Sequence, residues 1–345
     1  MKSLLYLRDQ IAWFGSHTGY EQLTRYMAEE ANCSVVGRRG GQLTRYLGSF
    51  YARLHGRSGR GATDFSEVEL RLRHSLQRPS LSHILYLEDH LNLIRAWKHR
   101  SKNVVGTIHL PPSVWRPEQC ESLSRLTAAL VLYRRDFAFF EKYLGKGRVK
   151  FIHHGADLDF FKPDLTKLLL PPRILYSGVF LRNEPMLVRL VNQLLNEMPQ
   201  LRFDLLIPLH HRKSPSLAPL LNHPAVTWHA GLNDDQLLEL YQKSYLMLLP
   251  MNDSGANTAV VEALGCGLPL VTTDVGGIRD YAGGDVFKIV ANNDDRAMVE
   301  LIAEYVAKPA WRNEVARKCR QFAEANLAWP LVARKHLATY QEIIA

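Results

Sequence analysis

Cysteine is scarce in this 345-residue chain, and its four cysteines stand far apart. They are Cys33, Cys120, Cys266 and Cys319. Because no two are close neighbours, the sequence offers neither a local disulfide framework nor a zinc site of the CxxC type. The scarcity favours a reducing compartment.

Long apolar runs are missing as well. None approaches the roughly 20 residues that span a bilayer. Arg8 and Asp9 interrupt what would have to be the apolar core of a signal peptide. We therefore expect a cytoplasmic protein without a transmembrane anchor. The composition is globular, with 46% hydrophobic and 22% charged residues, and it excludes a disordered or fibrous chain.

Several common motifs are absent. The sequence has no GxGxxG after its first expected strand, no GxxxxGKS or GxxxxGKT, and no GxSxG. These absences count against a dinucleotide oxidoreductase, a P-loop enzyme and an α/β-hydrolase. Histidine pairs occur at 153–154 and 210–211, but no carboxylate or thiol stands at ligand spacing to complete a zinc site. We expect no metal ion and no other cofactor.

Short β-branched or Leu-rich runs alternate along the chain with stretches of helical period. The expected strands are LLYLRDQ (4–10), SHILYLE (82–88), NVVGTIHL (103–110), AALVLY (128–133), VKFIHHG (149–155), PRILYSG (172–178), RFDLLIPL (202–209), VTWHAG (226–231), YLMLLPM (245–251) and LPLVTTD (268–274). Buried strands separated by amphipathic helices indicate an α/β fold with two doubly wound parallel sheets. Prolines bracket 163–172, where we expect the two domains to join.

The net charge of +9 lies entirely in the first half of the chain. Residues 1–165 contain 25 Lys and Arg against 16 Asp and Glu, whereas residues 166–345 contain 18 of each kind. One domain is therefore expected to face an anionic partner, such as lipid headgroups, nucleic acid or an acidic acceptor. The alternative is a soluble domain that is merely basic.

The stretch 38–60 concentrates this charge, with six arginines and no acidic residue. The arginines are Arg38, Arg39, Arg45, Arg53, Arg57 and Arg60. Apolar residues recur between them at helical spacing, which predicts a basic amphipathic helix. Two interpretations stay open: the apolar stripe meets an anionic membrane or a lipid-linked acceptor, or it packs in the core while the arginines are solvated. No nucleic-acid-reading motif accompanies the stretch, and its aromatics follow the helical period, so nucleic acid is not expected as a partner.

The strongest candidate for chemistry is the segment 244–277. A strand is expected to end at Pro250, and a helix to begin near Thr258. The polar loop between them contains Asp253, Ser254, Gly255, Ala256 and Asn257. Free N–H groups at the start of that helix suit a phosphate. Glu262 stands one turn further on, where it can accept two ribose hydroxyl hydrogen bonds or simply be an exposed helical glutamate.

This segment, VVEALGCGLPLVTTDVGG, resembles the donor-site motif of the GT-B glycosyltransferases of family 4, a large retaining group that uses nucleotide sugars. HHGADLDFFKP (153–163), 226–250, WFGSHTGYEQLTRYM (13–27) and TIHLPP (107–112) are similar to further family segments in the same order. The resemblance implies two Rossmann-like domains facing each other across a cleft. Residues 1–165 would form the acceptor side, completed by a C-terminal helix at 330–345. Residues 166–329 would bind the nucleotide-sugar donor.

The resemblance also implies roles for single residues. Gly15 and Gly19 would let the backbone approach the donor phosphate or the acceptor, and His109 would face the cleft near the transferred sugar. On sequence alone, a glycine pair is only a turn and a lone histidine at a strand end is more often structural.

The sequence departs from the family at three positions. Ser254 stands where the family usually has the first of two glutamates eight apart. Val179 and Glu184 replace the arginine and lysine that clamp the diphosphate, and Arg182 is the cation nearby. Two alternatives stay open. Arg182, with Arg212 or Lys213, substitutes for that pair, or the protein is a slow or inactive enzyme.

The leading interpretation is a glycosyltransferase that moves a hexose from a UDP-, GDP- or ADP-sugar to a glycan or lipid-linked acceptor. Retention and a role in surface polysaccharide or glycolipid biosynthesis are expected, with peripheral contact at an anionic inner membrane face as a further possibility. The alternatives are a nucleotide-sugar epimerase of the same fold and a GT-B binding protein that has lost catalysis.

Overall fold

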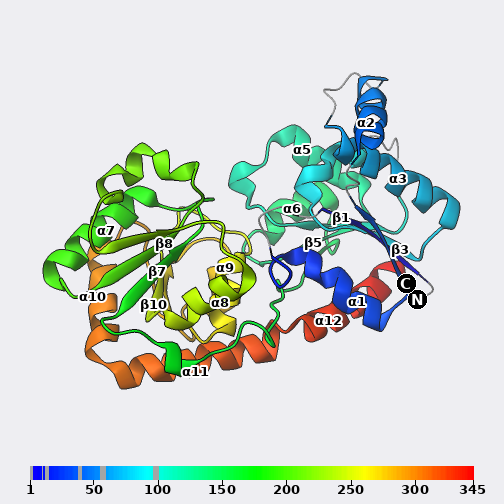
Figure 1. Ribbon diagram of the computed structural model, residues 1–345. Helices are drawn as coiled ribbons and strands as arrows, with labels where there is room; N and C mark the ends of the chain where they lie inside the picture. The colour runs from blue at the N-terminus through cyan, green and yellow to red at the C-terminus, as the bar shows by residue number, and fades with distance from the viewer. Residues whose placement is uncertain (1–2, 10, 12–14, 38–40, 55–59, 96–100) are drawn as a thin grey trace. The chain divides into compact units, whose positions relative to one another are not determined.

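The structure is a computed structural model that describes residues 3–9, 11, 15–37, 41–54, 60–95 and 101–345. The chain divides into two compact units (Figure 1). Unit 1 comprises residues 1–14, 19–153 and 329–345, and unit 2 comprises residues 15–18 and 154–328. Each unit is built around one parallel sheet.

The sheet of unit 1 has the strand order β2-β1-β3-β4-β5-β6, and every neighbouring pair is parallel. Its strands are β1 (Leu4–Arg8), β2 (Cys33–Gly37), β3 (Leu81–Ile84), β4 (Val104–Ile108), β5 (Ala128–Val131) and β6 (Val149–Phe151). The central strands are apolar because helices cover both faces of the sheet. The strand order changes direction at β1, which has β2 on one side and β3 on the other.

The α-helices of unit 1 are α1 (Leu23–Glu30), α2 (Gln42–Leu54), α3 (Ala62–Gln77), α4 (Leu91–Arg95), α5 (Pro117–Ser122), α6 (Phe137–Leu144) and α12 (Trp329–Ile344). Its 3-10 turns are η1 (Tyr20–Gln22), η2 (Leu87–His90), η3 (Pro112–Val114) and η4 (Leu123–Arg125). Figure 1 shows the last helix, α12, beside α1, and the two helices pack together. The C-terminal segment thus completes the first unit.

Buried hydrogen bonds fasten α12 to the sheet. The His83 imidazole lies between the hydroxyls of Tyr340 and Thr107, at 2.6 and 2.7 Å. The Tyr20 hydroxyl lies 2.8 Å from His336 Nε2. Burial lowers the pKa of His336 to about 4, so the ring is neutral and the network is one of uncharged groups.

The sheet of unit 2 has the order β12-β11-β10-β7-β8-β9, again all parallel. Its strands are β7 (Arg173–Ser177), β8 (Arg202–Leu206), β9 (Val226–His229), β10 (Leu246–Leu249), β11 (Leu270–Thr273) and β12 (Ile289–Val290). This is the doubly wound Rossmann order, and the direction of winding reverses between β7 and β10.

The α-helices of unit 2 are α7 (Glu184–Glu197), α8 (Asp234–Lys243), α9 (Thr258–Gly265), α10 (Asp295–Ala307) and α11 (Pro309–Asn326). Its 3-10 turns are η5 (Leu165–Lys167), η6 (His211–Lys213), η7 (Pro215–Leu220) and η8 (Ile278–Tyr281). Every residue of α9 from its second position to its end is buried, because the helix packs against α11.

The predicted fold class is confirmed, and all ten expected strands are present with shorter bounds. The prediction missed β2, which lies at the sheet edge and is largely half-buried, and the two-residue β12. Residues 154–165 were predicted to belong to the first domain, whereas their contacts place them in unit 2. Hydrogen bonds to distant residues of unit 2 are the reason: the His154 N–H donates to the Tyr281 hydroxyl, and the Ala156 N–H donates to the Leu327 carbonyl.

No helix among the described residues is long and apolar enough to cross a membrane.

Candidate functional site

Two loops meet at the carboxyl edge of the unit 2 sheet. Residues 178–183 follow β7, and residues 250–257 follow β10. The Asn183 N–H donates to the Pro250 carbonyl at 2.9 Å, and the Asn252 N–H donates to the Leu181 carbonyl at 2.9 Å. Doubly wound sheets bind ligands outside the carboxyl ends of the strands, where the winding reverses. The two loops therefore form the first candidate site.

Arg182 lies in this site and is held by backbone carbonyls. Its Nε donates to the Ser177 carbonyl and its Nη1 to the Phe180 carbonyl, both at 3.1 Å. Among the described residues it makes hydrogen bonds but no ion pair with a carboxylate. Burial lowers the pKa of Arg182 below its ordinary value. A desolvated cation without a counter-ion is a suitable partner for a phosphate.

The loop after β10 leads into α9, which begins at Thr258 as predicted. The Asn257 side chain caps the helix by accepting the Ala259 N–H at 3.1 Å. The Ser254 hydroxyl donates to the Gly255 carbonyl at 2.9 Å and is buried. The loop and the helix start bring together the predicted donor-site residues Asp253, Ser254, Gly255, Ala256, Asn257 and Thr258. The helix start adds the positive end of its dipole.

Glu262 is buried in α9, with 4% of its surface exposed, so its interpretation as an exposed helical glutamate is wrong. Its Oε2 accepts a hydrogen bond from the Tyr241 hydroxyl at 2.8 Å. Among the described residues, its Oε1 and the hydroxyl oxygen of Thr18 are buried and make no hydrogen bond of ordinary length and angle. Burial raises the pKa of Glu262 to about 7, although the nearby Tyr241 and Thr18 hydroxyls act in the opposite direction. An unsatisfied buried oxygen is costly and therefore suits a hydroxyl-bearing ligand.

Glu184 occupies the position where the family resemblance implies a lysine. Its buried carboxylate accepts hydrogen bonds from His211 Nε2 and, at 2.8 Å, from the Ser214 hydroxyl. Neighbouring donors therefore satisfy the acid, and it supplies no cation. Of the two further cations considered, the Arg212 guanidinium lies 5.4 Å from the Trp228 ring centroid and Lys213 is exposed.

The segment 15–18 belongs to unit 2 through its own contacts. A Cβ atom on Gly15 would lie 1.6 Å from Asp234 Oδ1, so a larger residue here would require the Asp234 carboxylate to move. The Ser16 N–H donates to Asp234 Oδ2 at 2.8 Å. His17 Nδ1 lies 2.6 Å from Asp157 Oδ2, a pair that the sequence analysis missed.

Gly19 has a φ of 98°, which favours glycine. The predicted roles of Gly15 and Gly19 toward a ligand stay predictions.

His109 follows β4 in unit 1. Its Nε2 lies 2.8 Å from the Leu85 carbonyl, so Nε2 carries the proton and donates. The ring stacks on Tyr86, with centroids 4.7 Å apart, and meets Tyr20 edge-on. The ring is thus fixed in position and tautomer, and its predicted role toward the transferred sugar stays a prediction.

The basic stretch forms α2, and its large apolar residues point outward. Leu43, Tyr46, Leu47 and Phe50 are 70%, 68%, 43% and 51% exposed. The small residues of the opposite face pack inward: a Cβ atom on Gly48 would lie 1.9 Å from the Gly61 carbonyl oxygen in front of α3. The interpretation in which the stripe packs in the core is therefore wrong for these four residues.

The six arginines of this stretch have different surroundings. Arg45 and Arg53 are exposed on α2. Arg60 instead binds Glu67, with Nη2 2.6 Å from Oε1, so its charge is paired within unit 1. Arg38, Arg39 and Arg57 lie outside the described residues.

Among the described residues, no group of three or more His, Cys, Asp or Glu side chains is placed to hold a metal ion.

Two parallel doubly wound sheets of six strands, with the candidate site at the carboxyl edge of the second, define the GT-B fold. Residues 213–326 match the family described as Glycosyl transferases group 1. The chain therefore has the GT-B fold, and over residues 213–326 it is similar to the Glycosyl transferases group 1 family.

Solved structures share the fold across the chain. The sucrose-phosphate synthase of Thermosynechococcus elongatus is 16% identical and superposes with a TM-score of 0.77, covering 99% of each chain. HepE of Anabaena, solved in complex with UDP-glucose, is 12% identical with a TM-score of 0.73, covering 99% of this chain and 100% of the other.

Sequence relatives match a part of the chain. The D-inositol 3-phosphate glycosyltransferase of Streptomyces avermitilis is 25% identical over 211 residues, which are 54% of this chain and 45% of the relative. A protein of the same name from Nocardioides is 26% identical over 225 residues, 56% of this chain and 48% of its own length. The matched region thus spans about half the length of these relatives.

Proposed function

We propose that this protein transfers a hexose from a nucleotide sugar to a glycan or lipid-linked acceptor, with retention, as family 4 enzymes do. The single observation that carries the proposal is the arrangement at the edge of unit 2. There Arg182 lies in the loop before α7 and Glu262 lies in α9, after the neighbouring loop. Among the described residues, Arg182 has no carboxylate partner and Glu262 Oε1 is buried without a hydrogen bond.

The two residues divide the donor between them. Glu262 accepts hydrogen bonds from ribose hydroxyls through Oε1, which has no hydrogen-bond partner among the described residues. Arg182 and the N–H groups at the start of α9 bind the diphosphate. Negative charge grows on that diphosphate as the glycosidic bond breaks, and fixed donors stabilise it most in the transition state. A metal ion is not required in this arrangement.

The relatives support this chemistry in outline. Two of them are named for glycosyl transfer to an inositol phosphate, and one structural neighbour was solved with UDP-glucose. The proposed donor is accordingly a UDP-, GDP- or ADP-hexose, and the proposed pathway is surface polysaccharide or glycolipid assembly.

The exposed face of α2 supports contact with an anionic membrane surface. Four apolar side chains form one outward stripe, and Arg45 and Arg53 are exposed on the same helix. The sequence of the stretch has six arginines and no acid, which complements anionic lipid headgroups. We place a lipid-linked acceptor at such a surface.

A second candidate is a GT-B protein that binds but does not transfer. The observation in its favour is Glu184, a carboxylate held by His211 and Ser214 where the resemblance implies a clamping lysine.

A thermal-shift screen of the purified protein against UDP, GDP, ADP and their hexose conjugates tests the proposal. A ligand at 100 times its Kd adds about 2.7 kcal/mol of stability. We expect one nucleotide family to stabilise the wild type and a Glu239→Gln control, and to stabilise Glu262→Gln much less. Glu239 is an exposed carboxylate on α8 and is the matched control.

No shift with any nucleotide would overturn the proposed donor site. Stabilisation without turnover of the nucleotide sugar would favour the binding protein.

A further inference from the structure

A second carboxyl edge, that of unit 1, carries polar groups that the donor site does not use. Its winding changes direction at β1, so the crevice rule for doubly wound sheets applies between β1 and β3. Asp9 follows β1, η2 follows β3, and His109 follows β4. Within η2, Glu88, Asp89 and His90 are consecutive.

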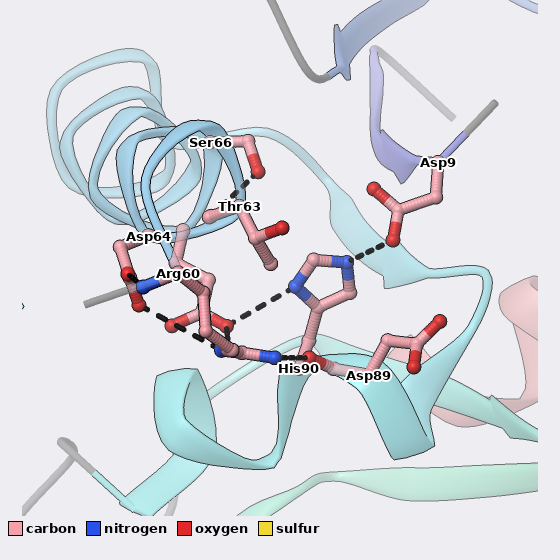
Figure 2. A network of polar contacts seen from close by, with 8 residues as sticks. Asp9, Arg60, Thr63, Asp64, Ser66, Asp89 and His90 are labelled. Atoms are coloured by element: carbon pink, nitrogen blue, oxygen red, sulfur yellow. Dashed lines mark hydrogen bonds and ion pairs between the residues drawn. The ribbon is translucent and has the colours of Figure 1, made fainter. Parts of the chain in front are cut away.

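Buried charges hold η2 in place (Figure 2). His90 Nε2 lies 3.0 Å from Asp9 Oδ2, and its Nδ1 lies 3.2 Å from Glu67 Oε1. Arg60 binds the same Glu67 carboxylate and also donates to the Asp89 carbonyl. Burial lowers the pKa of His90, but the two carboxylates outweigh it and raise the pKa to about 9. The ring is therefore charged, and η2 is fixed by ionic hydrogen bonds on two sides.

Glu88 is fixed by one of its two oxygens. Oε1 accepts the His109 N–H at 2.6 Å and the Leu110 N–H at 2.8 Å. Apart from the backbone N–H of Glu88 itself, no further described residue donates a hydrogen bond to this carboxylate. A side chain anchored at one oxygen by two backbone donors presents the other at a defined position.

Aromatic rings gather around the backbone that anchors Glu88. Tyr86, two residues before it, stacks on the His109 ring, and Tyr20 meets the same ring edge-on. Few polar groups among aromatic side chains are typical of small-molecule sites. The two cations of the η2 network, Arg60 and His90, are already paired with carboxylates. The arrangement suits a neutral, hydroxyl-bearing ligand better than an anion.

We propose that Glu88 binds a hydroxyl group of a neutral sugar acceptor through Oε2, with the η2 network as its support. This inference rests on the proposed glycosyl transfer and names the chemical class recognised on the acceptor side. In this role the carboxylate accepts the acceptor's O–H hydrogen bond and orients the hydroxyl.

The test measures nucleotide release from the nucleotide sugar that stabilises the protein, in the presence of neutral acceptor probes. The probes are the methyl glycosides of glucose, galactose and mannose, and n-octyl β-D-glucopyranoside. Glu88→Gln keeps an Oε1 that accepts both N–H groups and removes the negative charge. Glu121→Gln, an exposed carboxylate on α5, is the control.

We expect at least one probe to accelerate nucleotide release by the wild type and by Glu121→Gln. In Glu88→Gln we expect the KM for that probe to rise about tenfold or more while the thermal shift with the donor is unchanged. A merely structural role would lower the donor shift and the thermal stability together, and that outcome overturns the inference.

Two further outcomes also overturn it. Equal probe KM values in Glu88→Gln and the wild type would show that Oε2 does not bind the acceptor. Donor binding without acceleration by any probe would reject a neutral sugar. If no nucleotide binds at all, the proposed function is contradicted, and the inference, which rests on it, is contradicted as well.

Discussion

The carboxyl edges of the two units carry similar acids in opposite electrostatic settings. Glu262 in unit 2 and Glu88 in unit 1 both have a pKa raised to about 7 by burial. In unit 2 the nearby cation, Arg182, has no carboxylate partner among the described residues. In unit 1 the cations Arg60 and His90 are both paired. The same sheet architecture therefore suits an anion at the carboxyl edge of unit 2 and hydroxyl groups at the carboxyl edge of unit 1.

The largest expected effect is on the pH dependence of stability. A carboxyl whose pKa rises on folding, from 4.5 to about 7 for Glu262, holds its proton more tightly in the folded state. Stability therefore falls as the pH rises across that window, by up to about 3 kcal/mol. Denaturant unfolding between these pH values should show a flatter profile for Glu262→Gln than for the wild type.

The comparison between units sharpens this prediction. Glu88→Gln should flatten the pH profile of stability less than Glu262→Gln does. The Glu88 side chain is half-buried, so water screens its carboxylate more. His336 acts in the opposite direction, because burial lowers its pKa to about 4 and its contribution is lost as the pH falls through 6.5. The His336 contribution is the same in the wild type and in both variants, so it cancels when the profile of a variant is subtracted from that of the wild type. Identical profiles for all three proteins would show that neither carboxyl is perturbed.

Arg182→Ala should weaken the binding of the stabilising nucleoside diphosphate by roughly tenfold to a hundredfold, the range of a charged hydrogen bond of about 1.5–3 kcal/mol. Isothermal titration measures the loss. Arg189→Ala is the control, because Arg189 is an exposed arginine of the same unit that pairs with Asp295. Unchanged affinity in Arg182→Ala would show that Arg182 does not bind the diphosphate, and the proposed electrostatic difference between the two sheet edges would then be wrong.

The arginines of α2 should contribute about 1 kcal/mol each to binding an anionic bilayer. Replacing Arg45 and Arg53 with glutamine should therefore lower co-sedimentation with phosphatidylglycerol vesicles by about tenfold or more at moderate salt. Phosphatidylcholine vesicles serve as the uncharged control. Replacing Tyr46 and Phe50 with serine should also lower binding, with a weaker dependence on salt. Equal sedimentation of all variants would contradict the membrane role of unit 1.

The smallest effect concerns two helix caps within unit 2. Asn257 caps α9 and Asn233 caps α8, each by accepting a backbone N–H. Alanine at either position should cost about 1 kcal/mol of stability in denaturant unfolding. Only Asn257→Ala should also weaken nucleotide binding, because α9 begins at the site. Equal losses of nucleotide affinity in both variants would show that loss of a helix cap in unit 2 weakens binding wherever that cap lies. The location of α9 at the candidate site would then not explain the effect.

Much of the candidate site in unit 2 was predictable from the sequence because it is built from local segments. The strand before Pro250, the loop and the start of α9 at Thr258 are contiguous, and a spacing of one turn suffices to single out Glu262. Arg182 was found because only a few residues separate it from the end of β7. The burial of Glu262 was not predictable, because it depends on Tyr241, 21 residues away.

His109 at the edge of unit 1 was singled out from the sequence, but Glu88 and the η2 network were missed because their contacts are long-range. Glu88 is anchored by residues 21 and 22 positions later, and His90 meets Asp9 across 81 positions. A signal existed in the run LEDH, where three consecutive titratable residues begin four positions after the end of the buried strand β3. Arg60 was expected on the acceptor or membrane face, because a charge in an amphipathic stretch does not reveal its partner, here Glu67.

The most direct test of the difference between the two edges is hydrogen–deuterium exchange with and without the nucleoside diphosphate that stabilises the protein. The account predicts protection in the peptides that cover 178–183 and 252–262, and no change in those that cover 85–91. Protection confined to residues 85–91, or equal protection at both edges, would contradict the assignment of the anion site to unit 2.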